Sequence, residues 1–230
     1  MRQRLSDTAT EMFLERGFDG VRVAEIAGAC GVSEKTVFNY FPTKESLVLD
    51  LGENTMAALR TDLALPGRSP VDAVLGILSG ELRGLVSWIA AQDDPVQAAA
   101  MIRRFRELTR STPSLRAYHR DMNDRLIGVA AEVLAGRTGM SPEDPEPQIA
   151  ATALLGLWPI QFRSLGKHLA GVRTSEQAER VHEAVTADVR RAARLIETGL
   201  VPDSGRTADP DQAGGLIAEF ESVTDPRGDS

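Results

Sequence analysis

The side chains with the clearest chemistry lie in the string SEKTVFNYFPTK, which covers residues 33–44. An asparagine can hold adenine through two hydrogen bonds, a threonine methyl group can touch the methyl group of thymine, and a lysine can meet guanine or a phosphate. These residue types, close together in the chain, point to recognition of double-stranded DNA through base edges and phosphates. The candidate DNA-contacting residues are Arg22, Ser33, Lys35, Thr36, Phe38, Asn39, Tyr40 and Lys44.

Two short helices joined by a tight turn would position these side chains. Residues 23–30 carry apolar side chains spaced three and four apart, which predicts a short helix with one apolar face. Gly31 can then take the left-handed conformation that ends a helix. Ser33 can begin a second helix, over residues 33–40, by accepting a bond from a free backbone N–H group.

The second helix has its own apolar anchors and its own stop signal. Val37 and Phe41 lie four residues apart and would face the first helix. Pro42 would end the helix, because the residue before a proline is pushed out of the α region. The pattern predicts a helix-turn-helix whose second helix enters the major groove of DNA. The alternative is a helical hairpin packed into a larger bundle.

The string resembles the N-terminal DNA-binding domain of the TetR family of bacterial transcriptional regulators. The matching segments are GF at 17–18, VAEIA at 23–27, AxxCGVS at 27–33, TVFNYF at 36–41 and TKE at 43–45. The resemblance implies an all-α fold of about nine helices, with an N-terminal three-helix helix-turn-helix domain and a C-terminal helical domain for ligand binding and dimerisation. Beyond residue 50 the match is one of length and helical character only.

Charge and composition are consistent with three regions. The chain has 230 residues and a net charge of −7, to which residues 203–230 contribute −5 and residues 1–50 only −2. Affinity for DNA would therefore rest on a few placed cations and on helix N-termini. We expect a helix-turn-helix domain over 1–50, a helical ligand-binding and dimerisation domain over 51–202, and an acidic tail over 203–230 that is disordered.

The periodicity predicts helices throughout the first two regions. Helix one covers residues 2–16, and a helix capped by Thr43 runs to Leu65, where the Pro66–Pro70 loop breaks it. The further helices are expected at 71–91, 96–110, 113–136, 148–170 and 174–199.

The last two predicted helices are expected to form a dimer interface. Residues 148–170 are apolar on most sides in their first half, which predicts burial all round, and residues 174–199 are amphipathic. The resemblance implies that the two helices pair with their copies in a four-helix interface. A two-fold partner also suits a helix-turn-helix that reads a palindrome. The alternative is that both are core helices of a monomer.

Large apolar residues outside the DNA-binding region are candidates for an effector pocket. Trp158 stands out because Pro159 follows it and would kink the predicted helix. The set is apolar and aromatic, so a hydrophobic ligand is favoured, although a residue of each of these types is more often part of an ordinary core. The candidates are Met56, Trp88, Met101, Phe105, Tyr118, Met122, Trp158 and Phe162.

These features predict a cytoplasmic, sequence-specific transcriptional regulator: a homodimeric repressor that a small hydrophobic ligand releases from a palindromic operator. The alternatives are a ligand-independent DNA-binding protein whose C-terminal domain only dimerises, and an enzyme or carrier with a vestigial helix-turn-helix. No catalytic, metal or cofactor motif is recognisable, since the three histidines are scattered and the single cysteine, Cys30, falls in the helix-turn-helix core. The sequence contains no uninterrupted run of eighteen apolar residues, so it predicts no membrane span.

Overall fold

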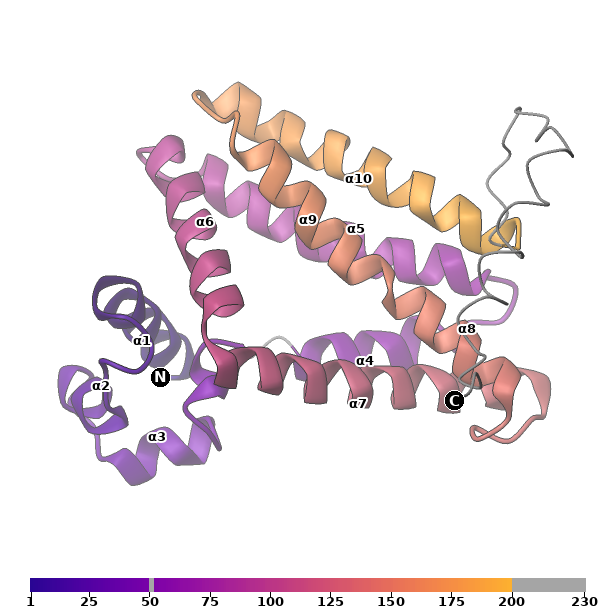
Figure 1. The fold of residues 1–230 in the computed structure, drawn as a ribbon, viewed down its shortest axis with the longest axis horizontal. Coiled ribbons are helices and arrows are strands. Elements are labelled where there is room, and N and C mark those ends of the chain that lie inside the picture. The colour runs from indigo at the N-terminus through magenta and orange to yellow at the C-terminus, as the bar shows by residue number, and fades with distance from the viewer. Residues whose placement is uncertain (50–51, 200–230) are drawn as a thin grey trace, which may run out of the picture.

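The computed structural model describes residues 1–49 and 52–199, and the regular structure of these residues is entirely helical (Figure 1). The expected all-α fold is confirmed. In chain order the elements are α1 (Arg2–Arg16), α2 (Val23–Ala29), α3 (Glu34–Tyr40), the 3-10 helix η1 (Glu45–Leu47), α4 (Gly52–Asp62), α5 (Pro70–Ala90), α6 (Pro95–Ser111), α7 (Pro113–Thr138), α8 (Pro145–Leu155), α9 (Leu157–Leu169) and α10 (Ser175–Glu197).

The first three helices enclose a small apolar core of their own. Leu5, Ala9 and Phe13 line the inner face of α1 and are fully buried. The ring of Phe18 lies 5.0 Å from that of Phe13, so the segment after α1 closes the same core. Figure 1 shows α1, α2 and α3 grouped at one end of the molecule, below α6.

The expected turn chemistry of the helix-turn-helix is present. Gly31 has a φ of 67°, the left-handed conformation that ends α2. The Ser33 hydroxyl accepts a hydrogen bond of 3.1 Å from the backbone N–H of Thr36 and so caps α3. Val37 and Phe41 have no exposed surface, which confirms that they face inward.

The remaining helices form a larger body with its own core. Figure 1 shows α4 and α7 side by side along one edge, with α5, α9 and α10 above them and α6 joining the two levels. Helix α10 packs on α5 and α9, and α7 packs on α4 and α8. The inner stripe of α10 is Val181, Val185, Val189 and Ala193, all buried.

The prediction of a single helix over 148–170 is wrong, because the chain divides at Gly156 into α8 and α9. Pro159 is therefore the third residue of α9, where its missing N–H leaves no helical bond unmade, and it does not kink a helix. Burial all round is wrong as well, since Ile149 is 64% exposed and Phe162 44% exposed.

The helix predicted over residues 43–65 is also shorter than expected. The described chain has η1 over 45–47 and α4 over 52–62, and residues 50–51 between them lie outside the description. Thr43 still acts as a cap, because its hydroxyl accepts a bond of 3.2 Å from the N–H of Ser46. The expected acidic tail lies in residues 200–230, which are likewise outside the described part of the chain.

Helix α5 is, by length and by a mean hydropathy of 1.4, apolar enough to cross a membrane, although no unbroken apolar run marks it. In the structure it packs against α4 and α10, with Val74, Leu78 and Leu82 buried in the main core. This packing is that of a core helix.

Candidate nucleic-acid interface

Helix α3 presents a polar and aromatic surface on the side away from its buried anchor. Lys35 and Asn39 are exposed, and in the described part of the chain neither side chain has a hydrogen bond or an ion pair within the protein. Phe38 and Tyr40 are exposed by 44% and 38%, which is unusual for aromatic residues of a short helix. These four side chains are therefore available to a partner outside the chain.

Ser33 and Thr36, the other two candidates near the start of α3, have a local role. Their hydroxyl oxygens lie 2.9 Å apart, and that of Ser33 also caps the helix. Both hydroxyl groups therefore help to form the helix N-terminus. The backbone N–H groups at this end carry the positive end of the helix dipole and suit a phosphate oxygen.

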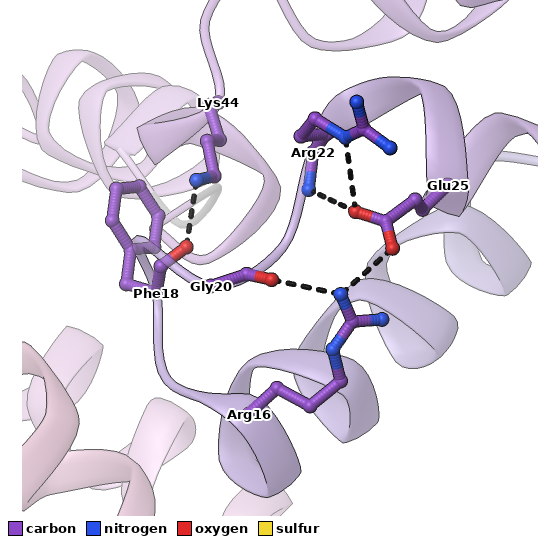
Figure 2. A network of polar contacts seen from close by, with 6 residues as sticks. All are labelled: Arg16, Phe18, Gly20, Arg22, Glu25 and Lys44. Atoms are coloured by element: carbon purple, nitrogen blue, oxygen red, sulfur yellow. Dashed lines mark hydrogen bonds and ion pairs between the residues drawn. The ribbon is translucent and has the colours of Figure 1, made fainter.

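Arg22 begins α2 and belongs to a network centred on Glu25 (Figure 2). The backbone N–H of Arg22 donates to the Glu25 carboxylate at 2.8 Å, and the Arg16 guanidinium donates to the same carboxylate at 2.7 Å and to the Gly20 carbonyl at 2.8 Å. The Arg22 side chain is 83% exposed, and its Nε lies 3.5 Å from Glu25. Glu25 thus closes the N-terminus of α2, while the Arg22 guanidinium extends into solvent.

The same network holds the pKa of Glu25 at about 2, against an ordinary value of 4.5. The main cause is the hydrogen bond from the Arg22 backbone, followed by the bond from Arg16. A carboxyl group whose folded-state pKa is depressed stabilises the fold above its unfolded pKa and loses that contribution as the pH falls through the folded value.

Glu25→Gln is therefore expected to lower the stability of the chain at neutral pH, and the difference from the parent is expected to narrow between pH 4.5 and pH 2. Urea unfolding followed by circular dichroism at successive pH values measures this difference. Glu15→Gln, at an exposed position of α1, is the control. A stability difference between variant and parent that stayed constant over this pH range would show that the charge of Glu25 does not stabilise the fold.

Lys44, predicted as a phosphate contact, is half-buried and bonded within the protein (Figure 2). Its ammonium nitrogen donates to the Phe18 carbonyl at 2.6 Å and lies 4.3 Å from the centre of the Phe18 ring. It also lies 5.6 Å from the centre of the Phe13 ring. Lys44 therefore joins the segment after α3 to the segment after α1, a role that its sequence position did not indicate.

Lys44→Met is expected to lower the free energy of unfolding by about 1–3 kcal/mol, because it removes a hydrogen bond from a charged donor and a cation–π contact. Lys35→Met is the matched control, because Lys35 is exposed and has no partner in the described part of the chain. Chemical denaturation measures both variants. Equal stability of the two would mean that the Lys44 amine contributes nothing to the fold.

Arg2 is a site residue that the candidate set missed. Its guanidinium donates to the Tyr40 carbonyl at 2.9 Å and lies 4.7 Å from the centre of the Phe41 ring. The first turn of α1 is thereby fixed to the last turn of α3. The only sequence signal was a basic residue at the start of a helix.

The helix-turn-helix region also packs on the larger body. Leu115, near the start of α7, is fully buried within the core of α1–α3, and Phe105 and Leu108 of α6 pack against that core. Arg104 of α6 donates to the Leu14 carbonyl at the end of α1 at 2.6 Å. The α6–α7 corner therefore contacts the DNA-binding helices directly, in addition to the covalent connection through η1 and α4.

The eight candidate pocket residues do not converge on one place. Phe105 belongs to the corner just described, Trp88 and Phe162 are 39% and 44% exposed, and Met101 and Tyr118 are half-buried on α6 and α7. The other three, Met56, Met122 and Trp158, pack into the main core from α4, α7 and α9.

A partly buried carboxyl group joins this last part of the core. Glu81 of α5 accepts a hydrogen bond of 2.8 Å from the Thr55 hydroxyl of α4 and one of 3.0 Å from the indole N–H of Trp158. Burial raises the pKa of Glu81, against the opposing effect of these two donors. One side chain therefore ties α4, α5 and α9 together, and sequence spacing gave no sign of it.

Two family models match the chain, and together they cover most of it. Residues 5–51 match the model described as bacterial regulatory proteins, tetR family, and residues 83–201, more than half of the chain, match the MftR C-terminal domain. The first match includes α2, α3 and η1, and the second begins within α5 and includes α6 to α10.

Relatives and solved structures are similar to the chain over most of its length. The HTH-type transcriptional regulator TcmR of Streptomyces glaucescens is 30% identical over 155 residues, which are 62% of each chain. The putative mycofactocin biosynthesis transcriptional regulator MftR of Mycobacterium tuberculosis is 28% identical over 153 residues, which are 66% of this chain and 73% of that one. A crystal structure of Thermus thermophilus FadR, a TetR family transcriptional repressor in complex with lauroyl-CoA, is 24% identical with a TM-score of 0.49 and covers 91% of this chain and 100% of that chain.

Proposed function

This chain belongs to the TetR family of bacterial transcriptional regulators, and from that premise we propose that it is a homodimeric cytoplasmic repressor that a small hydrophobic ligand releases from a palindromic operator. The observation that carries the proposal is the surface of α3. Its exposed lysine and asparagine lie opposite the buried Val37, and its two aromatic side chains are exposed beside them, as a groove-reading helix requires.

The DNA contacts that we propose divide into two kinds. Asn39, Thr36 and Lys35 would face base edges, with Phe38 and Tyr40 beside them on the same helix. Arg22, Ser33 and the N-terminal turn of α3 would meet phosphates. Lys44 would act mainly by positioning the domain, since its amine is bonded to the Phe18 carbonyl.

The proposed dimer forms through residues 148–170 and 174–199. Large apolar side chains are exposed on all three helices of this region: Ile149 on α8, Phe162 on α9 and Leu195 on α10. Exposed large apolar side chains on neighbouring helices support a surface that another chain covers. A second copy satisfies this surface and gives the two α3 helices the two-fold relation that a palindrome needs.

Ligand release is proposed to act through the core around Glu81. Met56, Met122 and Trp158 pack there from three different helices, and methionine side chains repack readily around an apolar guest. A hydrophobic ligand among them would disturb the bonds that Thr55 of α4 and Trp158 of α9 donate to Glu81.

Two helices, α4 and α7, connect the core around Glu81 to the DNA-binding helices. Helix α4 follows η1 in the chain, and α7, which carries Met122, also places Leu115 in the core of α1–α3. Ligand binding can only shift the equilibrium between two arrangements by its difference in affinity for them. The division into domains 1–50 and 51–202 stays a prediction. Leu115 is one of several described residues that pack across it.

Selection of genomic DNA fragments on the purified full chain, at physiological salt and followed by sequencing, tests the DNA function. We expect enrichment of one palindrome. The same selection is repeated after the protein is unfolded and refolded to remove any carried ligand. Lack of enrichment in both preparations would contradict sequence-specific binding and would favour an enzyme or carrier with a vestigial helix-turn-helix.

The second test concerns the ligand. The small molecules released on unfolding are collected, and operator affinity is measured for the refolded protein with and without them. Release by ligand predicts weaker binding when they are added back. Operator binding that neither stripping nor a screen of hydrophobic compounds alters would favour the ligand-independent alternative.

A further inference from the structure

A cavity of about 510 Å³ lies between α5 and α10, away from the proposed effector core. Its walls are formed by the first half of α5 and the second half of α10, with one residue of α9, Gln161, in the lining. None of the eight candidate pocket residues lines it. Figure 1 places these parts of α5 and α10 at the end of the molecule opposite α3, so this cavity is no part of the DNA-reading surface.

Two polar side chains in the lining make no hydrogen bond among the described residues, and one of them, Thr186, has a fully buried polar atom. Gln161 is only 7% exposed, and in the described part of the chain its amide makes no hydrogen bond. The hydroxyl oxygen of Thr186 is buried and also unpaired among the described residues. Buried polar groups are normally satisfied, so the unpaired Thr186 hydroxyl indicates that something else supplies its bond. The Gln161 amide in the same lining is also free to bond to a bound molecule.

The cavity is also lined by arginines from both walls. Arg190 and Arg194 lie one turn apart on α10, both are exposed, and neither side chain is paired in the described residues. Arg68, from the segment before α5, donates to the Asp72 carbonyl at 2.9 Å and lies 3.7 Å from the Asp62 carboxylate.

The negative groups of the lining are fewer. The lining has two carboxylates, Asp72 and Glu197. The Asp72 carboxylate accepts a bond of 3.0 Å from the Ser69 hydroxyl. Arg68 is paired with Asp62, so Arg190 and Arg194 are the two guanidinium groups of the lining that are available to a ligand. Guanidinium groups bind phosphate and carboxylate oxygens through paired, charge-assisted hydrogen bonds.

We propose that this cavity binds a small organic anion: a phosphate or carboxylate group carried on a hydroxylated body. The oxyanion would lie between Arg190 and Arg194, and the hydroxyl groups would bond to Gln161 and Thr186. The apolar side chains Leu78 and Val189 in the lining would contact the carbon skeleton.

Isothermal titration calorimetry of the full chain tests this site without any DNA, so its outcome is independent of operator binding. The probes are glucose 6-phosphate for the phosphate source, gluconate for the carboxylate source and glucose as the uncharged control. We expect saturable binding of at least one anion and none of glucose. Arg190→Gln with Arg194→Gln is expected to weaken that binding by about tenfold or more.

Two further variants separate a built site from general charge. Gln161→Leu keeps the cationic residues and is expected to weaken the sugar anion more than inorganic phosphate. Arg180→Gln changes an arginine of α10 that is ion-paired with Glu176 outside the cavity, and it is expected to have no effect. No saturable binding of either anion, equal binding of glucose, or equal loss in Arg180→Gln would overturn the proposal.

Discussion

Phe162→Arg is expected to leave the chain monomeric and to lower its affinity for a full palindromic operator by about a hundredfold or more. Phe162 is 44% exposed on α9, and the proposed interface also contains the exposed Ile149 and Leu195. In a two-fold interface the substitution acts twice, because each copy would bring an unpaired guanidinium group into an apolar contact. A monomer also loses the gain in effective concentration that comes from two linked half-sites.

Light scattering after size-exclusion chromatography measures the oligomeric state, and mobility shifts on full and half operators measure the affinity. Binding to an isolated half-site should change little, since α3 is untouched. Trp88→Arg is the matched control, because Trp88 is also large, apolar and 39% exposed, but lies on α5 outside the proposed interface. A Phe162→Arg protein that remained dimeric with parental operator affinity would place the interface elsewhere.

Asn39→Ala is expected to lower operator affinity by about tenfold to a hundredfold without lowering stability. Asn39 is exposed on α3 and makes no side-chain bond in the described part of the chain, so its removal leaves the fold intact. A paired contact from asparagine to adenine contributes about 1–3 kcal/mol of discrimination, and a dimer makes it in both half-sites. Tyr40→Ala, on the same surface, is expected to weaken binding in the same direction.

Fluorescence anisotropy with the selected operator measures the affinity, and thermal unfolding measures the stability. Asn54→Ala is the matched control, since it makes the same substitution at an exposed position of α4. The loss in Asn39→Ala should be large for the selected operator and small for unrelated DNA. Unchanged operator affinity in both Asn39→Ala and Tyr40→Ala would mean that α3 does not read the base edges.

Long-range contacts account for the predictions that the structure changed. Lys44 follows a helix in a position suited to a phosphate contact, yet its amine bonds to a carbonyl 26 residues earlier. Phe105 has the size and polarity of a pocket residue, but it packs against the core of the DNA-binding helices. A lysine or a phenylalanine suits more than one environment. The residues that lie beside it in the folded chain determine which environment it occupies.

The helix boundaries of α3, which have local sequence signals, were predicted correctly, and a boundary without such a signal was not. Ser33, Gly31 and Pro42 give local signals that depend on neighbours within one or two turns, and α3 begins and ends as they predict. The break at Gly156 had no comparable signal, since a glycine inside a helical pattern is usually tolerated. The apolar pattern on both sides of it continued without change, and so one helix was predicted where two exist.

The sequence by itself determined the helix-turn-helix, its buried anchors and the side chains that α3 presents, because these depend on capping, turn conformation and helical periodicity over a few residues. Only the tertiary structure decided how the helix-turn-helix packs on the larger body and which side chains join the helices of that body. Glu81 bonds to residues 26 and 77 positions away, and Leu115 completes a core formed by the first fifty residues. Such contacts depend on which helices meet, and periodicity within one helix carries no information about its neighbours.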